Sequence, residues 1–593
     1  MDKITYVPES GGKSLRDVFR FEWPVLAAVS LLLFVTASVF MSGWPSGLIP
    51  NLQYPYSYDG DGLFILATIK KVIEGAWIYI NGRLGFPFCG NSYAYPIPDS
   101  GSLLLLKVLG KLFGSPQAAM NMFFLLGFPV TFICSYVFLR VVGLSRSFSA
   151  VAGILFAFLP FHFQRLNHLF FTWYFVVPIF FYFGYNLFFY STGFLRAEWS
   201  ISKAVLSAVV LFVSASFGVY YAFFGCLLLF ASAAAGAIRN NTSRCFMAGL
   251  AVIAVVVCGV LVNTAPNIIH KMASEHKNNV ASRGPAESEV YGLKLIQLLL
   301  PREGHRVRIV DKAARRYARK FPLVNENATS ALGVIGAAGL LLLLGTAFAA
   351  LSGGKVDARL VFLSLITLFL ILFATIGGFS SLFAFMITSQ LRAWNRISVF
   401  IGFGAISVFF LILQTYLQKH FLEAQARRAM LPVAVCLCFL GVFDQTSPAS
   451  VSSASALRAN FDSDHAFVKG IEAIVPGDSA IYQLPYVPFP EAPTPYQLPE
   501  YALFAGFLHS TSLRWSYGGI KREEGDSFLK ALSMQPLEGQ VAEISRLGFA
   551  GIYVDRRGFE DHGRGVEGDL RRIFKSGPRL QSADGNLSFF LIP

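Results

Sequence analysis

Residues 397–417 read ISVFIGFGAISVFFLILQTYL, a run without a single acidic or basic side chain. A helix of about 20 apolar residues is long enough to cross the roughly 30 Å hydrocarbon core of a bilayer. Runs of this kind recur along the first 446 positions of the 593-residue chain. The pattern therefore predicts a mainly α-helical, polytopic membrane protein.

The composition and the positions of the runs agree with this prediction. Charged residues make up 14% of the chain, against about 25% in soluble domains. We place eleven spans near residues 23–43, 117–139, 147–161, 169–190, 203–219, 220–237, 246–264, 331–351, 360–384, 397–417 and 430–446. The segment 101–114 is shorter and interrupted by Lys107 and Lys111, so we expect it to be interfacial or re-entrant.

The basic residues of the short loops predict the orientation. Lys and Arg accumulate in short cytoplasmic loops of membrane proteins. With a cytoplasmic N-terminus, the inside receives Lys3, Lys13, Arg16, Arg20, Arg140, Arg146, Arg196, Lys203, Arg239, Arg244, Lys355, Arg359, Lys419, Arg427 and Arg428. The loops 44–116 and 265–330 and the C-terminal residues 447–593 then lie outside.

The C-terminal residues 447–593 differ in character from the transmembrane part, 1–446. Short runs such as SAIYQLPY, GIYVD and LSFFLIP are typical of strands, and DSFLKALSM and VAEISRLG of helices. We predict a small soluble α/β domain that supports the membrane part or binds an acceptor molecule, and that does not hold the catalytic centre. Deletion beyond about residue 455 is therefore expected to leave some catalytic activity. Trp515 and Tyr517 could stack on sugar rings there, although core packing explains them equally well.

Two carboxylates stand just after the first predicted span, in the stretch YPYSYDGDGLF (residues 54–64). Asp and Gly favour turns, so an acidic turn is one interpretation of Asp59 and Asp61. The other interpretation is catalytic, because a carboxylate here could take a proton from an acceptor hydroxyl. Its neighbour could then hold a divalent cation such as Mg²⁺ or Mn²⁺. The following LFILATIKKVIEG is expected to be an amphipathic helix on the membrane surface.

Two groups of cationic residues are candidates for binding a phosphate at the headgroup level. His162, Arg165 and His168 follow one another at intervals of three and would share one face of a continuous helix. Arg392 and Arg396 lie four apart at the outside mouth of a span. A polar hairpin and snorkelling arginines are the alternative interpretations. The loop 265–330 adds twelve basic against six acidic residues, which could form a solvated face or could attract an anionic lipid-linked donor or an acidic glycan.

These features together resemble the GT-C-type membrane glycosyltransferases, a superfamily with many spans and a carboxylate-bearing first external loop. The stretches GPAESEVYGLKLIQLLLP and AWNRISVF are also similar to stretches of bacterial polytopic proteins of this type. The resemblance implies a multi-pass protein of the bacterial cytoplasmic membrane with an extracytoplasmic C-terminal domain. It further implies transfer of a sugar from a polyprenyl-phosphate-linked donor to a glycan, lipid or protein acceptor.

The resemblance also implies roles for particular residues. Asp59 or Asp61 would act as the general base on the acceptor hydroxyl, and Asp59 is slightly favoured because it comes first after the tyrosine-rich stretch. Arg165, His168, His162, Arg392 and Arg396 would stabilise the departing phosphate. A divalent cation, if one is used, would be held by Asp61 with Glu287 or Glu289.

Other functions fit the same sequence. A lipid-linked saccharide flippase or other transporter would be expected to carry charges inside its spans, whereas here they concentrate in the outside loops. A non-catalytic protein of polysaccharide assembly and a phosphoglycerol-type membrane transferase are the further alternatives. Nucleic acid is not an expected partner outside a membrane.

Overall fold

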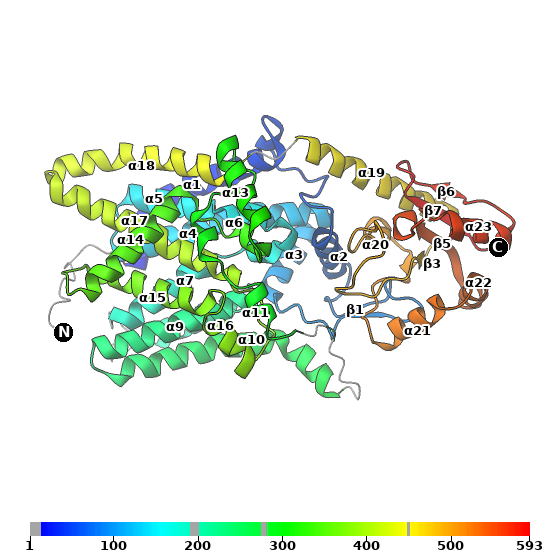
Figure 1. Cartoon of the computed structure of the whole chain (residues 1–593), viewed down its shortest axis with the longest axis horizontal. Coiled ribbons are helices and arrows are strands. Elements are labelled where there is room, and N and C mark those ends of the chain that lie inside the picture. The colour runs from blue at the N-terminus through cyan, green and yellow to red at the C-terminus, as the bar shows by residue number, and fades with distance from the viewer. Residues whose placement is uncertain (1–13, 190–200, 274–279, 281–282, 448–450) are drawn as a thin grey trace.

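The computed structural model describes residues 14–189, 201–273, 280, 283–447 and 451–593. A helical bundle occupies most of the molecule, and a smaller part with both helices and strands adjoins one end of it (Figure 1). Lys3, Lys13 and Arg196, which entered the predicted orientation, lie outside the described residues, and so does the side chain of Arg427.

Nine stretches of the described residues are long and apolar enough to cross a membrane. They are α1 (Leu15–Ser42), α4 (Pro116–Val142), α5 and α6 (Arg146–Ala157 and Pro160–Gln164), η2 and α7 (Leu166–Thr172 and Val176–Phe189), α9 (Val219–Arg239), α10 (Ser243–Ala273), α14 (Gly333–Leu351), η4 and α17 (Trp394–Ile397 and Ser398–His420) and α18 (Glu423–Gln445). Two shorter apolar helices, α8 (Ile201–Ser214) and α15 (Ala358–Ala374), coincide with the other two predicted spans. The chain is therefore an integral, multi-pass membrane protein.

The bundle has a central helix and lipid-facing helices. Of the 18 consecutive residues that are most apolar in the stretch containing α17, 83% are buried inside the protein. The corresponding share is 22% for α1 and 24% for α18. Apolar side chains on these outer helices stay exposed, such as Leu31 at 66% and Phe439 at 75%. Exposed apolar surface of this extent suits helices in contact with acyl chains rather than with water.

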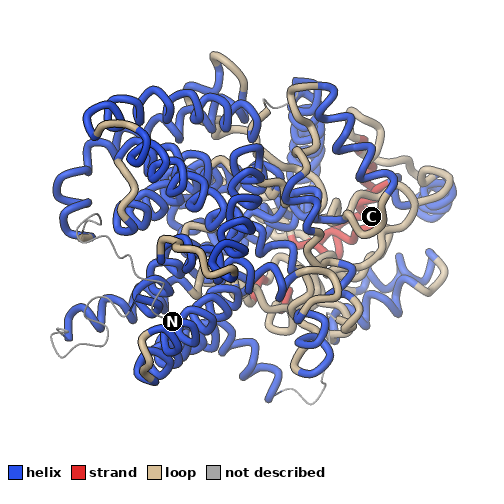
Figure 2. Tube along the Cα trace, turned by 60° about the vertical axis from the view of Figure 1, so that its left-hand side comes forward, coloured by secondary structure: helices blue, strands red, loops and turns tan. Residues whose placement is uncertain are grey.

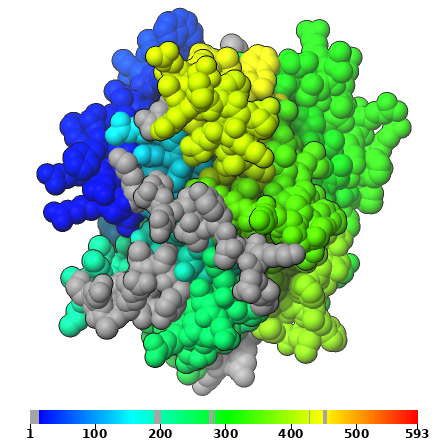
Figure 3. All heavy atoms as spheres, turned by 90° about the vertical axis from the view of Figure 1, so that its left-hand side faces the viewer, coloured from blue at the N-terminus to red at the C-terminus, as the bar shows by residue number. Residues whose placement is uncertain are grey.

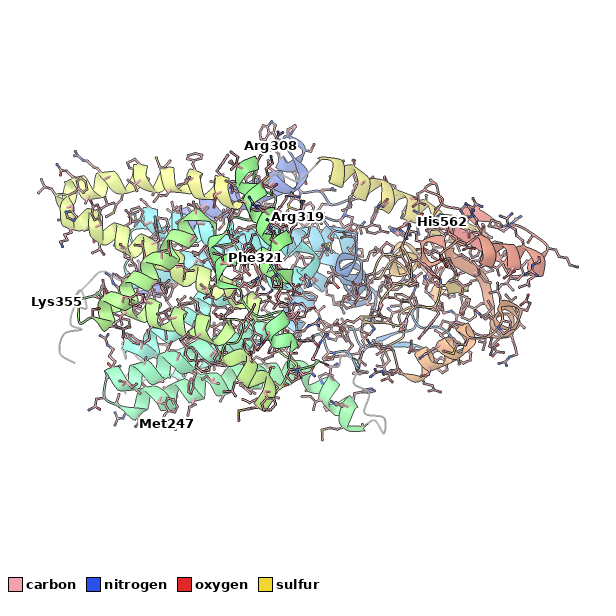
Figure 4. All side chains as sticks on the ribbon, viewed as in Figure 1. Met247, Arg308, Arg319, Phe321, Lys355 and His562 are labelled. Atoms are coloured by element: carbon pink, nitrogen blue, oxygen red, sulfur yellow. The ribbon has the colours of Figure 1, made fainter. Side chains whose placement is uncertain are left out.

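The connections that are predicted to lie outside form short elements at the end of the bundle that adjoins the C-terminal part. They are η1 (Ser46–Leu48), α2 (Asp61–Glu74), β1 (Ile80–Asn81), β2 (Gly90–Asn91), α3 (Ser100–Phe113), α11 (Glu287–Val290), α12 (Leu295–Leu299), α13 (Arg308–Lys320), η3 (Asn325–Thr329) and α16 (Phe379–Met386). The basic helix α13, which bears Arg308 and Arg319, runs across the direction of the spans (Figures 1 and 4).

The helix α2 differs from its predicted place on the membrane surface. Its apolar residues Leu66, Ile69 and Val72 are fully buried. The Lys70 ammonium donates to the backbone carbonyls of Leu508 at 2.8 Å and Ser510 at 2.5 Å. The C-terminal part therefore covers this helix, because its charged face pairs with backbone carbonyls instead of with lipid headgroups or water.

The C-terminal part is the α/β unit that the sequence predicts. Its sheet has the order β4-β3-β5-β7-β6, in which β3 is parallel to β4 and β5, and β7 is antiparallel to β5 and β6. The strands are β3 (Ala480–Leu484), β4 (Arg514–Trp515), β5 (Phe549–Asp555), β6 (Leu580–Gln581) and β7 (Leu587–Leu591). The helices are α19 (Val451–Ile474), α20 (Phe504–His509), α21 (Glu524–Ser533), α22 (Leu537–Arg546) and α23 (Arg564–Phe574), with η5 (Arg556–Gly558). Figure 2 shows the strands on the side of the molecule where the C-terminus lies.

The first outside loop and the C-terminal part share one hydrophobic core. The loop continues the sheet beyond β4, because the Trp515 amide donates to the Arg83 carbonyl at 2.8 Å and the Phe86 amide donates to the Trp515 carbonyl at 3.0 Å. The Tyr58 hydroxyl donates to Asp464 at 2.7 Å and lies 2.7 Å from the His509 ring. We therefore expect deletion beyond residue 455 to expose this core and abolish activity, contrary to the expectation from sequence.

The orientation predicts which side chains a membrane-impermeant reagent reaches. Lys355 and His562 lie at opposite ends of the molecule (Figure 4), and the C-terminal part is hidden when the bundle is viewed from its other end (Figure 3). In a background with Cys89, Cys258 and Cys436 replaced by serine, which lacks the three exposed native thiols, a cysteine at 562 should react in intact spheroplasts. A cysteine at 355 should react only after permeabilisation. The reverse pattern would overturn the orientation.

Candidate active site

A cavity of about 1430 Å³ lies where the spans meet the loops that adjoin the C-terminal part. Segments from distant parts of the chain line it. They are Asp61–Ile65, Tyr95–Asp99, Asn167–Phe171, the first turns of α9, the middle of α10, the loop residues Arg283, Tyr291, Asn325 and Glu326, Gln390–Arg396, Glu491–Thr494 and Glu500–Tyr501. The proline-rich C-terminal stretch therefore forms part of the cavity wall.

Asp61 lies in this cavity, in the first turn of α2. Its Oδ2 is 3.2 Å from His168 Nε2, and its side chain is 38% exposed. Burial raises the pKa of Asp61 to about 6, and the carboxylates of Glu500, Glu326 and Glu491 add to this while Arg396 opposes it. A carboxylate with a pKa close to neutral is suited to general-base work at physiological pH.

Asp59 is placed differently, although only one residue separates it from Asp61. Its exposed carboxylate accepts hydrogen bonds from Ser57 Oγ and Asn167 Nδ2, both at 3.2 Å. Gly60 has φ 45°, ψ −126° and precedes the first residue of α2, so the chain turns between the two aspartates. Of the pair, Asp61 lines the cavity and Asp59 holds the turn in front of it.

Arg396 is the cation that the cavity fixes most tightly. Its guanidinium lies over two aromatic rings, 4.0 Å from the centre of Phe171 and 4.6 Å from that of Tyr220. Its Nη2 is 3.5 Å from Glu326 Oε2. Its buried Nε has no hydrogen-bond partner among the described residues. Arg396 also lines the cavity, so its planar guanidinium is a candidate ligand for an anion there.

The other arginines of the site are paired with glutamates. Arg392 donates to Glu287 at 2.6 Å, and Arg283 donates to Glu491 at 2.6 Å. Arg165, predicted as a phosphate ligand, is 1% exposed and donates to Glu326 at 2.6 Å behind the cavity wall. Although burial alone would raise the pKa of Glu326, Arg396 and Arg165 hold it at about 2. Arg165 thus positions Glu326 and, through it, Arg396.

His162 does not share a face with Arg165 and His168 as predicted. The helix α6 ends at Gln164, and His168 has non-helical backbone angles within η2. The His162 ring is fully buried, stacks on Phe128 at 3.7 Å between ring centres and lies outside the cavity lining. The kink therefore separates the three residues, and only His168 reaches the cavity.

The residues predicted to hold a cation are not gathered together. Glu287 pairs with Arg392, and Glu289 accepts a hydrogen bond from Ser381 at 3.0 Å. Among the residues that the structure describes, no group of three or more His, Cys, Asp or Glu side chains could hold a metal ion. A role for Mg²⁺ or Mn²⁺ with Asp61 stays a prediction.

Trp515 and Tyr517 are core residues and not a sugar platform. Trp515 is fully buried, and its Nε1 donates to Ser510 at 2.9 Å. Tyr517 is 8% exposed and packs edge-on against Phe504, 4.8 Å between ring centres. The tight fit of these rings in the interior leaves no open face for a sugar.

One side of the cavity is apolar and lies between two spans. It is lined by Val219, Ala222, Phe223 and Cys226 of α9 and by Val257, Val260 and Leu261 of α10. From Val219 to Cys226 the lining follows about 10 Å of α9, at 1.5 Å per residue. The cavity therefore joins a charged region at the end of the spans nearest the C-terminal part to an apolar groove between α9 and α10.

No protein-family model and no curated protein matches this sequence. Solved structures do. ArnT from Cupriavidus metallidurans aligns over 97% of this chain and 98% of its own, with 10% identity and a TM-score of 0.49. The oligosaccharyltransferase AglB from Archaeoglobus fulgidus, solved with an inhibitory peptide and a dolichol-phosphate, aligns over 97% of this chain and 74% of its own, with 11% identity and a TM-score of 0.46.

A third structure, the arabinofuranosyltransferase AftD from Mycobacteria, aligns over 93% of this chain and 37% of its own, with 15% identity and a TM-score of 0.45. All three TM-scores lie below 0.5.

Proposed function

We propose that this protein transfers a sugar from a lipid-phosphate-linked donor to an acceptor hydroxyl at the outer surface of the membrane. One observation carries the proposal. A single cavity combines the Asp61 carboxylate, the Arg396 guanidinium with an unused donor, and an apolar groove between α9 and α10. These are the surroundings that a base, a phosphate and a lipid chain each need.

The groove and Arg396 fix the orientation of the donor. The lipid chain lies along Val257 and Phe223, which places its phosphate at the polar end of the groove. There Arg396 offers a planar guanidinium that matches the geometry of phosphate oxygens. Because the guanidinium packs against both Phe171 and Tyr220, little conformational freedom is lost when the phosphate binds.

Asp61 stands where an acceptor hydroxyl can be deprotonated. Its carboxylate takes the proton while the acceptor oxygen attacks the anomeric carbon of the sugar. The bond from that carbon to the phosphate oxygen breaks, the electron pair leaves with the lipid phosphate, and the configuration at the anomeric carbon inverts. Arg396 stabilises the negative charge that develops on the phosphate. His168, 3.2 Å from Asp61, holds the base in place.

A lipid-linked saccharide flippase is the second candidate, and the extent of the cavity favours transfer over it. Flipping a headgroup needs a polar path across the membrane. In the described part of the chain, the cavity lining includes no residue from the loops at the opposite end of the bundle. The groove ends among apolar side chains of α9 and α10, which suits a lipid tail and not a sugar.

Two valine substitutions on α10 test whether the groove binds the lipid. Val257 lines the cavity and is 45% exposed, whereas Val262 is 55% exposed and lies outside the lining. In purified protein, Val257→Trp should fill the groove and weaken binding of polyprenyl phosphate about 10-fold, the loss of roughly 1.4 kcal/mol. Val262→Trp, the same change on the same helix, should leave the Kd unchanged. Equal affinities for both variants would contradict the proposal.

A further inference from the structure

Asp99 is a buried carboxyl group of the cavity that the mechanism above does not use. It lines the cavity, is 9% exposed, and its Oδ1 has no hydrogen-bond partner among the described residues. Most buried polar atoms in folded proteins are hydrogen-bonded, because leaving one unpaired is costly. The unpaired oxygen of Asp99 therefore needs an explanation, and a ligand in the cavity supplies one.

The backbone around Asp99 is held firmly, while its side chain is left free. Asp99 precedes α3, and its carbonyl accepts a hydrogen bond from the Leu103 amide at 2.9 Å. An aspartate in this position usually caps the helix by accepting from a backbone amide through its side chain. Asp99 makes no such bond. Prolines at positions 96 and 98 restrict the preceding chain, so the carboxyl group is presented to the cavity on a rigid support.

Arg396 connects Asp99 electrostatically with the proposed reaction centre. Burial raises the pKa of Asp99 to about 7, and Arg396 is the neighbouring charge that opposes this rise. Arg396 also lowers the pKa of Asp61. Both carboxyl groups are thus within the field of the guanidinium that we assign to the donor phosphate. The group covalently attached to that phosphate is the sugar, and its hydroxyls are hydrogen-bond donors.

We propose that Asp99 is a specificity-determining residue that accepts a hydrogen bond from a hydroxyl of the sugar to be transferred. This inference rests on the proposed function and names the part of the donor that the site recognises. The acceptor hydroxyl is assigned to Asp61, on α2, and the sugar hydroxyl to Asp99, ahead of α3. Asp61 therefore contacts the acceptor, and Asp99 contacts the sugar of the donor.

The test compares two lipids on the purified full-length protein in nanodiscs. Polyprenyl phosphate carries no sugar, and a panel of polyprenyl-phosphate hexoses and pentoses carries one. Asp99→Leu removes the acceptor and keeps similar bulk. We expect its Kd for polyprenyl phosphate to match that of the wild type, while its Kd for the preferred sugar-bearing lipid rises 10- to 100-fold. Asp99→Asn, which retains one acceptor oxygen, should restore part of the affinity.

The thermal stability of the same variants separates recognition from a structural role. Replacing an unpaired buried carboxyl group by leucine should leave the Tm unchanged or raise it. Asp526→Leu is the matched control, because Asp526 is 6% exposed and accepts hydrogen bonds from Tyr486 and from the Arg522 amide. That variant should lower the Tm and leave the preference between the two lipids unchanged.

Three results would overturn the inference. In the first, Asp99→Leu raises the Kd for both kinds of lipid equally. In the second, it changes neither Kd. In the third, the wild type binds every sugar-bearing lipid no more tightly than polyprenyl phosphate. A wild-type protein that binds neither kind of lipid would instead overturn the proposed function, and the inference would fall with it.

Discussion

Asp61→Asn is expected to lower the rate of sugar transfer by about 100-fold or more, the usual contribution of a positioned general base. Asparagine keeps the shape of the side chain and can still accept a hydrogen bond from His168, so the donor should bind with unchanged affinity. It cannot take up the proton of the acceptor hydroxyl. The measurement is single-turnover transfer from a polyprenyl-phosphate sugar, with donor Kd determined on the same preparation.

Asp59→Asn is the matched control for this substitution. Asp59 is exposed, bonds to Ser57 and Asn167 and, unlike Asp61, does not line the cavity, so its replacement should change the rate only a few-fold. A 100-fold loss in Asp59→Asn together with normal transfer by Asp61→Asn would exchange the two roles. Normal transfer by both variants would remove the base from the mechanism.

The pH dependence of the wild-type enzyme gives an independent measure of the same group. Asp61 acts only when it is deprotonated, and burial raises its pKa to about 6. Below this pH, kcat/KM should therefore fall about tenfold per pH unit, and above it the rate should level off. The residual activity of Asp61→Asn should lack this acidic limb of the pH profile, the fall in kcat/KM below about pH 6. A limb near pH 4 in the wild type would show that the base is a solvated carboxylate.

Arg396→Met is expected to reduce kcat/KM by about 100-fold, because it removes both the charge and the donors that face the phosphate. Arg396→Lys should recover only a small part of the loss. Lysine retains the charge, so Glu326 keeps a cationic neighbour, but an ammonium lacks the planar fork that packs against Phe171 and Tyr220. The loss should appear in the Kd for polyprenyl phosphate as well as in the rate of transfer.

Arg514→Met provides the comparison for Arg396. Arg514 also lies over an aromatic ring, 4.7 Å from the centre of Phe86, and donates from Nε to a backbone carbonyl at 2.7 Å. It lies in the C-terminal part, outside the cavity lining. Its replacement should leave donor binding unchanged, and a loss equal to that of Arg396→Met would indicate a general effect on folding.

The membrane part of the fold could be predicted from sequence because each span carries its own signal of length and apolarity. The environment of α2 could not be predicted in this way. Its pattern of apolar and basic residues fits a membrane surface as well as a protein interior. The partner that covers Lys70 lies more than 400 positions away, at Leu508 and Ser510. Such a pairing has no local signature.

The candidate site shows the same limit. Asp61, His168, Arg392 and Arg396 could be proposed because charged residues beside apolar runs stand out in a sequence. The choice between Asp59 and Asp61 depends on the turn at Gly60. The partners Glu326 and Glu491 emerge only when distant loops converge. Asp99 left one local signal, a carboxylate between a proline-rich segment and an apolar helix, which by itself is typical of an ordinary helix cap.

The part of the cavity wall formed by Glu491–Thr494 and Glu500–Tyr501 has a consequence for biosynthesis. Ribosomes make a chain from its N-terminus, so all the spans that form the groove are synthesised before these residues. A partly synthesised chain thus has the apolar groove and Arg396 but lacks one wall of the cavity and the C-terminal part that covers α2. The proposed reaction centre is therefore complete only after the C-terminal part has been synthesised.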